Sequence, residues 1–242
     1  MLRSVHRSRK IGVMCGRYVL ISAGEVIAGH FNLERIPIVQ ASYNIAPTRM
    51  VRVVRVSDDG RRECVFMRWG FIPAWARSLT AVGMLNNARA ESIATKPAFR
   101  GAYKKRRCII PADGYFEWDE KVKPHQPYYF RLASGELAGL AGLWETWRSA
   151  DGEVIDSFAV VTREANDQTR AVHDRMPQLL APTEYTTWLE APDPGPLLVA
   201  PVSLSVRFHP VARGVNRVAQ DEAANIAVAD VEDPRPRQGS LL

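Results

Sequence analysis

Short runs in which apolar and polar residues alternate recur along most of the chain. Residues 50–56 and 62–69 alternate in this way on either side of the turn sequence at 58–60, which predicts an antiparallel hairpin. Further runs with the length and composition of strands are 14–20, 107–111, 115–118, 127–132, 137–144, 157–162 and 205–211. So many closely spaced strands are typical of a largely antiparallel, barrel-like sheet.

Helical spacing is limited to a few short segments between these runs. Residues 22–31 predict a helix in which Ser22 is the N-cap and Glu25 completes a capping box. Proline, glycine and asparagine mark two loops, at 37–49 and 70–78. Three more helices are predicted at 96–105, 166–173 and 183–190. The expected fold class is therefore α+β, a single domain with peripheral helices around the sheet.

The two ends of the chain lack the pattern of a packed element. Residues 1–13 are rich in arginine, and no small-residue cleavage site follows them, so we expect a leader that is either an artefact of start-site choice or disordered. Residues 229–242 are polar and contain proline, which predicts a disordered tail. The folded domain is accordingly expected at 14–228.

The composition narrows the class of protein. Hydrophobic residues make up 46% of the chain and charged residues 24%, and no run of about eighteen apolar residues exists, which indicates a soluble protein. The formal charge of +6 favours a polyanionic partner. The cysteines Cys15, Cys64 and Cys108 lack CxxC spacing, which argues against a disulfide framework and a zinc site. We therefore expect a reducing, cytoplasmic location and no metal or cofactor.

Four local clusters combine ionisable or polar residues with turn chemistry, at 14–18, 86–92, 111–118 and 172–177. Taken singly, Cys15 is typical of a buried strand residue and Glu117 of a solvated strand carboxylate. His173 is typical of a capping histidine and Asn87 of a turn residue. Together, a thiol, a carboxylate, a histidine and an amide are the groups that acid–base chemistry at a carbonyl carbon requires.

Six sequence motifs in and around these clusters follow one another along the chain. They are Met14-Cys15-Gly16-Arg17, Asn44-Ile45-Ala46-Pro47, Trp69-Gly70-Phe71-Ile72-Pro73, Asn87-Ala88-Arg89-Ala90-Glu91, Ala112-Asp113-Gly114-Tyr115-Phe116-Glu117-Trp118 and His173-Asp174-Arg175-Met176-Pro177. In this order they resemble the SRAP family (SOS response-associated peptidases), the abasic site processing proteins. The resemblance covers roughly residues 14–220. Any one motif is weak, whereas six in order are highly specific.

The resemblance implies a function in the DNA damage or SOS response. Members of this family bind single-stranded DNA, and their N-terminal cysteine closes a thiazolidine ring on the aldehyde of an abasic deoxyribose. They are also classed as cysteine-type peptidases, because the initiator methionine is removed autocatalytically. For this chain the resemblance implies an autopeptidase with lyase-like, DNA-crosslinking activity at Cys15. We expect a monomer that is nucleoid-associated when it is bound to damaged DNA.

The resemblance also implies roles for individual residues. Glu117 hydrogen-bonds the α-amine of Cys15 and shuttles its protons, His173 is the acid that opens the sugar ring, and Asn87 orients the sugar or the backbone. The expected DNA-binding residues are Arg17, Asn44, Pro47, Trp69, Trp75, Arg89 and His209. For the aromatic residues, packing in the core is the alternative. A basic run at 104–107 lines the strand path or is a solvated helix end.

The thirteen residues before Met14 depart from the family pattern, which begins at the methionine. Ordinary removal of Met1 would expose Leu2, and the nitrogen of Cys15 would remain an amide that cannot form an imine. Translation that starts at Met14 explains the extension best. The alternatives are self-cleavage between Met14 and Cys15, or an internal Cys15 that forms no thiazolidine.

Two other functions fit the same residues. A cysteine peptidase acting in trans would use Cys15 with His173, and processing of added peptides would reveal it. A non-covalent binding module for single-stranded or modified DNA would retain its binding after a Cys15→Ala substitution. Such a module would form no DNA adduct that survives denaturation.

Overall fold

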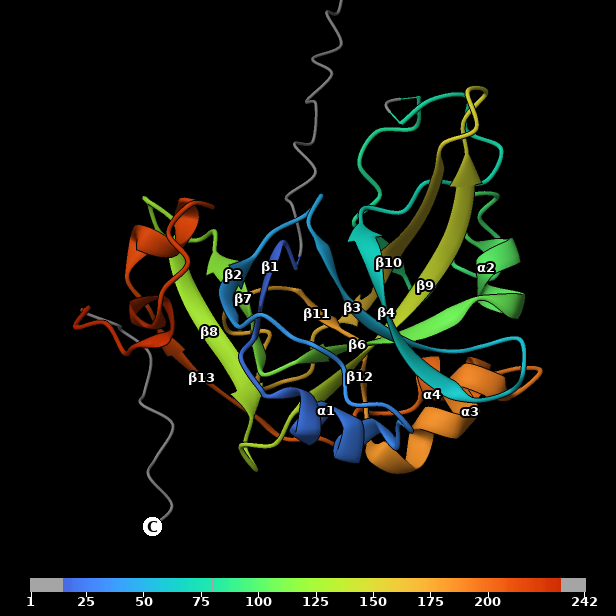
Figure 1. Cartoon of the computed structure of the whole chain (residues 1–242). Helices are drawn as coiled ribbons and strands as arrows, with labels where there is room; N and C mark the ends of the chain where they lie inside the picture. The colour runs from blue at the N-terminus through green and yellow to red at the C-terminus, as the bar shows by residue number, and fades with distance from the viewer. Residues whose placement is uncertain (1–14, 80, 232–242) are drawn as a thin grey trace, which may run out of the picture.

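Two β-sheets and a few short helices make up the computed structural model of the protein, which describes residues 15–79 and 81–231 (Figure 1). The smaller sheet lies on the left in Figure 1 and all its pairings are antiparallel. Its strands run in the order β13 (Val206–Pro210), β8 (Gln126–Leu132), β7 (Gly114–Asp119), β1 (Arg17–Leu20) and β2 (Ser42–Ile45). Two of the sequence clusters therefore lie on adjacent strands, β1 and β7.

The larger sheet follows a ring of strands. Around the ring run β10 (Val154–Glu164), β4 (Arg62–Trp69), β3 (Met50–Val56), β6 (Arg107–Ala112) and β9 (Ala138–Arg148), and β9 pairs again with β10. Two junctions are narrow, because β3 meets β6 only at Val54 and Ile109, and β4 meets β10 at two residue pairs. The sheet is ringed without being a closed barrel. The predicted α+β class, with a largely antiparallel, barrel-like sheet, is confirmed.

Three short strands extend the ring. β5 (Asn87–Arg89) pairs in parallel with β10, and β11 (Arg175–Pro177) pairs antiparallel with the same strand. β12 (Leu179–Leu180) pairs with β9. Because β5 and β11 carry the other two sequence clusters, β10 is the strand that brings these clusters close to each other.

The helices lie at the periphery, as predicted. α1 (Gly24–Phe31), α3 (Tyr185–Glu190) and α4 (Gly195–Val199) lie along the lower edge of the molecule in Figure 1, whereas α2 (Arg100–Lys105) packs on β6 and β9. Phe31 of α1 stacks on Tyr185 of α3 with 5.1 Å between ring centroids, and the Tyr185 hydroxyl hydrogen-bonds His30 at 2.8 Å. In the described part of the chain, no helix is long and apolar enough to cross a membrane.

One continuous hydrophobic core joins the two sheets. Tyr18 of β1 meets Trp69 of β4 edge to face at 5.3 Å, and Trp69 stacks on Phe158 of β10 at 6.2 Å. All three side chains are fully buried. Since burial of one large apolar side chain contributes roughly 1.5–3 kcal/mol, this stack holds the first strand of the small sheet against the ring.

Most of the predicted strands are confirmed, and their ends differ by a few residues from the observed bounds. The predicted helix at 166–173 is wrong, because these residues form turns. The side chain of Asn166 accepts hydrogen bonds from the backbone and hydroxyl of Thr169, both at 3.0 Å, and such local bonds compete with a helix. The loop predicted at 37–49 contains β2, whose alternation is too short to stand out in the sequence.

The predicted N-cap at Ser22 is also wrong. α1 begins at Gly24, and its N-cap residue is Ala23, which makes no side-chain cap. The Ser22 hydroxyl instead donates to the Asp113 carboxylate at 2.6 Å, and the same carboxylate accepts the backbone N–H groups of Ile21 and Ser22 at 2.6 and 2.9 Å. Asp113 lies between β6 and β7, so it ties the end of β1 to the connection between the two sheets.

The predicted leader at 1–13 lies outside the described residues. The same holds for most of the predicted tail at 229–242, of which the structure describes only residues 229–231.

Substitution of Asp113 by Ala is expected to destabilise the protein by roughly 2–4 kcal/mol, because three donors to a charged acceptor would lose their partner. Urea denaturation measures this loss. Asp151→Ala is the matched control, since Asp151 is an exposed turn residue. Equal midpoints for the two variants would contradict the anchoring role.

Candidate functional site

Cys15 and Glu117 meet where β1 begins beside β7. The register of this pair sets Arg17 opposite Phe116 and Tyr18 opposite Tyr115, which brings the residues just before β1 to Glu117. The backbone nitrogen of Cys15 donates a hydrogen bond to Oε1 of Glu117 at 2.9 Å. Both residues are buried, with 1% and 2% of their surface exposed. The alternative that Glu117 is a solvated strand carboxylate is therefore wrong.

Burial controls the protonation of this pair. It raises the pKa of Glu117 to about 8; the hydrogen bond from Cys15 opposes this rise, and the negative charges of Asp174 and Glu120 add to it. Burial, followed by the charge of Glu117, raises the pKa of the Cys15 thiol well above its usual value. At neutral pH the site therefore holds a thiol beside a carboxyl group that gains and loses a proton readily.

The backbone of Cys15 is strained. Its φ angle is 39°, in the left-handed region that residues with a side chain rarely adopt. Such conformations persist only where the surroundings impose them, and they concentrate at functional sites. Here the hydrogen bond to Glu117 and the complete burial of the side chain supply that constraint.

His173 lies in the turn that leads into β11, and its ring orientation is fixed by the chain itself. Nδ1 accepts the backbone N–H of Arg175 at 3.0 Å, so a neutral ring carries its proton on Nε2. Asp174 Oδ1 lies 3.3 Å from the same Nδ1 and is available to pair with a protonated ring. The negative charge of Asp174 raises the pKa of Glu117, so the His173 turn and the Cys15–Glu117 pair are electrostatically coupled.

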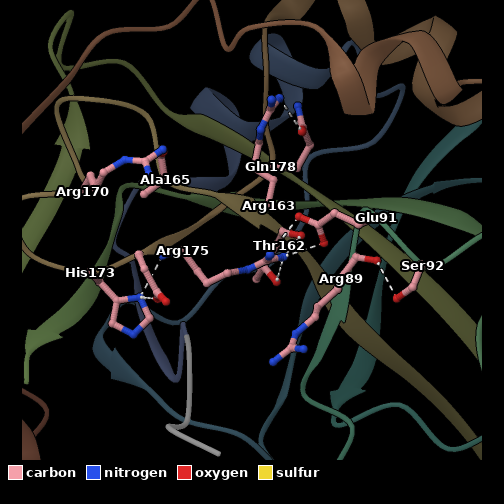
Figure 2. Close-up of polar contacts among 11 residues, drawn as sticks. Arg89, Glu91, Ser92, Thr162, Arg163, Ala165, Arg170, His173, Arg175 and Gln178 are labelled. Atoms are coloured by element: carbon pink, nitrogen blue, oxygen red, sulfur yellow. Dashed lines mark hydrogen bonds and ion pairs between the residues drawn. The ribbon is translucent and has the colours of Figure 1, made fainter.

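An ion pair holds this turn against β5 and β10. Figure 2 shows the Glu91 carboxylate facing the guanidinium of Arg175, with distances of 2.7 and 3.0 Å for the two hydrogen bonds. Arg175 also donates to the carbonyl of Thr162 at 2.7 Å. Asn87 is half-buried on β5, in register with Val160 of β10. Three of the four clusters are thus connected through β10 or through Asp174.

The predicted DNA-binding residues fall into two groups, and the first is accessible. Arg89 is exposed, and its side chain extends away from the Glu91–Arg175 pair in Figure 2. Trp75 exposes 61% of its surface on the loop after β4. Arg17 is half-buried next to Cys15, and burial lowers the pKa of its guanidinium. Pro47 is also half-buried, at the end of β2.

The second group has structural partners instead. Trp69 is fully buried and donates its indole N–H to the carbonyl of Asn86 at 3.0 Å, so core packing, the alternative for the aromatics, describes it. Asn44 is buried and directs its amide nitrogen at backbone carbonyls near the C-terminus. His209 Nε2 donates to the carbonyl of Ile226 at 2.9 Å. Trp69 and Asn44 are therefore enclosed in the protein, whereas His209 is half-buried, as are Arg17 and Pro47.

The basic run at 104–107 is divided in the same way. Lys104 and Lys105 are exposed at the end of α2. Arg106 pairs with Glu145 at 2.6 Å. Arg107 is buried and donates to the carbonyls of Leu189 and Ala191 at the end of α3. Half of the run thus ties helices to the sheet, which leaves the two lysines as its solvated part.

A shallow pocket with a volume of about 290 Å³ adjoins the candidate site. It is lined by Gly16, Arg17, Trp118, Glu120, His125 and Asn216. The sequence interpretation assigned no role to Trp118, His125 and Asn216. Trp118 directly follows Glu117 and could have been found from that position, whereas nothing in the sequence pairs Asn216 with it.

Within residues 15–79 and 81–231, no cluster of three His, Cys, Asp or Glu side chains is arranged to hold a metal ion.

Comparison with known proteins identifies the family. The sequence profile described as SOS response associated peptidase (SRAP) matches residues 14–218. The chain belongs to this family. Abasic site processing protein YoaM of Bacillus subtilis is 36% identical over an alignment of 189 residues that covers 76% of this chain and 82% of that protein. Abasic site processing protein HMCES of Xenopus tropicalis is 29% identical over 211 residues, covering 73% of this chain and 63% of that protein.

Solved structures share the fold. A protein from Bordetella bronchiseptica has a TM-score of 0.71 and 30% identity, covering 82% of this chain and 100% of that one. A protein from Bacteroides thetaiotaomicron has a TM-score of 0.79 over 89% of this chain and 100% of that one, at 24% identity. These solved structures therefore share the fold of this chain.

Replacement of Glu117 by Gln is expected to change how stability depends on pH. The folded-state pKa of about 8 lies above the ordinary value of 4.5, so the folded chain binds this proton more tightly than the unfolded chain. Stability should then fall as pH rises from about 4.5 to 8, by up to about 1.4 kcal/mol per unit, and Glu117→Gln should remove this fall.

Urea denaturation of the intact 242-residue chain at pH 5, 6, 7 and 8 provides the measurement. Glu153→Gln, at an exposed position just before β10, is the control that should retain the slope. Parallel pH profiles for wild type and Glu117→Gln would show that the carboxyl group titrates normally.

Proposed function

We propose that this protein processes abasic sites in single-stranded DNA by forming a covalent thiazolidine link between Cys15 and the ring-opened deoxyribose. The observation that carries the proposal is the 2.9 Å contact between the Cys15 nitrogen and a buried carboxyl group. The names of the relatives support abasic-site DNA as the substrate class. Family membership supports the same conclusion.

The chemistry requires that Cys15 is the first residue, because only a free α-amine condenses with an aldehyde. The neutral amine attacks the aldehyde carbon of the open sugar, and loss of one water gives an imine. The thiol of the same residue then adds to the imine carbon while its proton passes to nitrogen. The result is a five-membered thiazolidine ring, with one water released overall.

Glu117 is suited to move the protons of these steps. Burial raises the pKa of Glu117 toward the reference pKa of an α-amine, about 7.7–8.0, which lowers the free-energy cost of proton transfer between the two groups. A carboxylate takes a proton from the ammonium form, and the resulting carboxylic acid returns one when the hydroxyl group of the adduct leaves as water. Burial keeps bulk water from competing for these protons.

His173 is the proposed acid for ring opening. Nδ1 of His173 accepts the backbone N–H of Arg175. Nε2, the other ring nitrogen, is therefore the one that can protonate the ring oxygen of the closed sugar. In the doubly protonated ring from which this proton comes, Nδ1 also carries a proton, so it exchanges the Arg175 N–H for Asp174 Oδ1, which lies 3.3 Å away. Asn87, on β5 across β10 from β11, is proposed to orient the sugar through its amide group.

The DNA strand is proposed to pass over the accessible members of the predicted set. Arg17 and Arg89 present forked donors suited to phosphate oxygens, and Trp75 presents an exposed ring suited to stacking on a base. The net charge of +6 favours association with any single strand. Trp69, Asn44 and His209 are not part of this proposed surface, because their side chains are committed elsewhere.

Two routes expose Cys15 as the first residue. Translation from Met14 requires only removal of one methionine. Alternatively, the Cys15 thiol attacks the carbonyl carbon of Met14, the peptide C–N bond breaks as its nitrogen takes up a proton, and water hydrolyses the thioester. This second route consumes one water and releases residues 1–14, and the strained φ of 39° at Cys15 is consistent with a reactive peptide bond there.

A single-stranded oligonucleotide with one abasic site tests the function. A chain that begins at Met14 is expected to give a heat-stable adduct on a denaturing gel, and Cys15→Ala is expected to give none. Glu117→Gln should lower the rate of adduct formation about 100-fold or more, as loss of a general acid–base group typically does. Cys64→Ala is the matched control, a half-buried cysteine outside the site that should leave the rate unchanged.

The other outcomes identify the competing functions. Binding of the oligonucleotide without an adduct would replace the covalent function with a non-covalent binding module. Cleavage of added peptides that requires Cys15 and His173 would indicate a peptidase acting in trans.

Adduct formation and the absence of residues 1–14 are expected to go together. In a preparation of the chain that begins at Met1, intact mass spectrometry should find every adduct on molecules that start at Cys15. An adduct that retains the full 242 residues would contradict the requirement for a free α-amine. Comparison with Cys15→Ala shows whether loss of the leader depends on the thiol.

A further inference from the structure

The chain after β13 forms a compact loop, residues 212–227, here called the C-terminal loop. Its ends are joined by the isolated bridge between Val211 and Val228 and by the hydrogen bond from Ala229 N to Pro210 O at 2.9 Å. The loop contains two 3₁₀ turns, η2 (Arg213–Asn216) and η3 (Ala223–Ile226), and appears in orange-red at the left of Figure 1. Compact loops with closed ends often carry function.

Asn44 is the first anchor of the C-terminal loop. Its amide nitrogen lies 3.1, 3.0 and 2.9 Å from the carbonyl oxygens of Val215, Arg217 and Gln220. Asn44 is fully buried in β2, so a side chain of the small sheet fixes the middle of the loop from inside. A buried amide that loses such partners carries a desolvation penalty, which makes this contact specific.

Asp221 is the second anchor. Its carboxylate accepts hydrogen bonds from the Ser42 hydroxyl at 2.7 Å and from the backbone nitrogen of Tyr43, and it pairs with Arg49 at 3.1 Å. All three partners belong to β2 or follow it closely. The C-terminal loop is therefore bound to β2, the outer strand of the small sheet, on both sides of the centre of the loop.

The anchored loop presents Asn216 to the pocket beside the candidate site. Asn216 Oδ1 accepts the indole N–H of Trp118 at 2.7 Å. Trp118 is half-buried, directly follows Glu117 on β7 and lines the pocket together with Arg17. Arg213 of the same loop donates to the carbonyl of Pro124 at 3.2 Å, and the next residue, His125, also lines the pocket.

We propose that the C-terminal loop is a positioning element of the candidate site, in which Asn44 and Asp221 hold the loop and Asn216 fixes the Trp118 indole as a stacking platform for a nucleobase next to the abasic sugar. An indole that keeps its N–H bonded at one edge presents a flat face in a defined orientation. A base that stacks on this face would set the distance between its neighbouring sugar and Cys15. Asn44, Asp221 and Asn216 thus act through Trp118 and touch no reacting atom. The DNA part of this proposal rests on the proposed function.

The link between loop and indole can be measured without DNA. In protein labelled with ¹⁵N-tryptophan, the indole N–H signal of Trp118 is assigned from its disappearance in Trp118→Phe. We expect this signal to shift in Asn216→Ala and, to a smaller extent, in Asp221→Asn. Val218→Ala, at an exposed position of the same loop, should leave it in place. An unmoved signal in Asn216→Ala would overturn the proposal whether or not the protein acts on abasic DNA.

The effect on chemistry is measured as the rate of adduct formation. Asn216→Ala is expected to lower this rate about threefold to tenfold, the range that loss of one hydrogen bond supports, with little change in melting temperature because Asn216 is exposed. In a Trp118→Phe background the same substitution should have no further effect. Equal losses in both backgrounds, or no loss in either, would overturn the positioning role.

The two readouts separate two kinds of failure. If wild type forms no adduct although the indole signal shifts as expected, the proposed covalent function fails while the loop still positions Trp118. If wild type forms the adduct and Asn216→Ala forms it at the same rate, the proposed function stands and the positioning role is wrong.

Discussion

The candidate site depends on one carboxyl group that folding has removed from water. Glu117 is 2% exposed, and the backbone nitrogen of Cys15 donates to it, so the cost of burial appears as a pKa raised to about 8. The antiparallel register of β1 and β7 creates this contact. A slip of one residue would turn Glu117 to the opposite face of the sheet, which makes the register of this strand pair a condition of the chemistry.

The other parts of the site reach this pair from distant segments of the chain. β10 gathers the strands that carry Asn87 and the His173 turn, and the Glu91–Arg175 ion pair joins them. The C-terminal loop adds the wall next to Trp118 from the end of the domain. Both sheets share one hydrophobic core, so the two halves of the site are held at a fixed separation.

The sequence was sufficient for the features that depend on local patterns. Period-two alternation predicted the β3–β4 hairpin within its observed bounds, and the order of motifs predicted the family. The same patterns could not separate Trp69 from Trp75, because only the tertiary packing makes one fully buried and the other exposed. Asn44 was predicted to bind DNA because its burial, too, could not be deduced from the sequence. Its partners lie more than 170 positions away along the chain, and no local rule indicates them.

The burial of Cys15 has a consequence for its durability. Oxidants such as peroxides react with the thiolate, and the rate follows both the thiolate fraction and access to the sulfur. At Cys15 both are low, since the thiol is 1% exposed and its pKa is raised. A readily ionised and exposed cysteine would be oxidised to sulfenic acid faster. Burial of Cys15 therefore slows oxidation of its thiol.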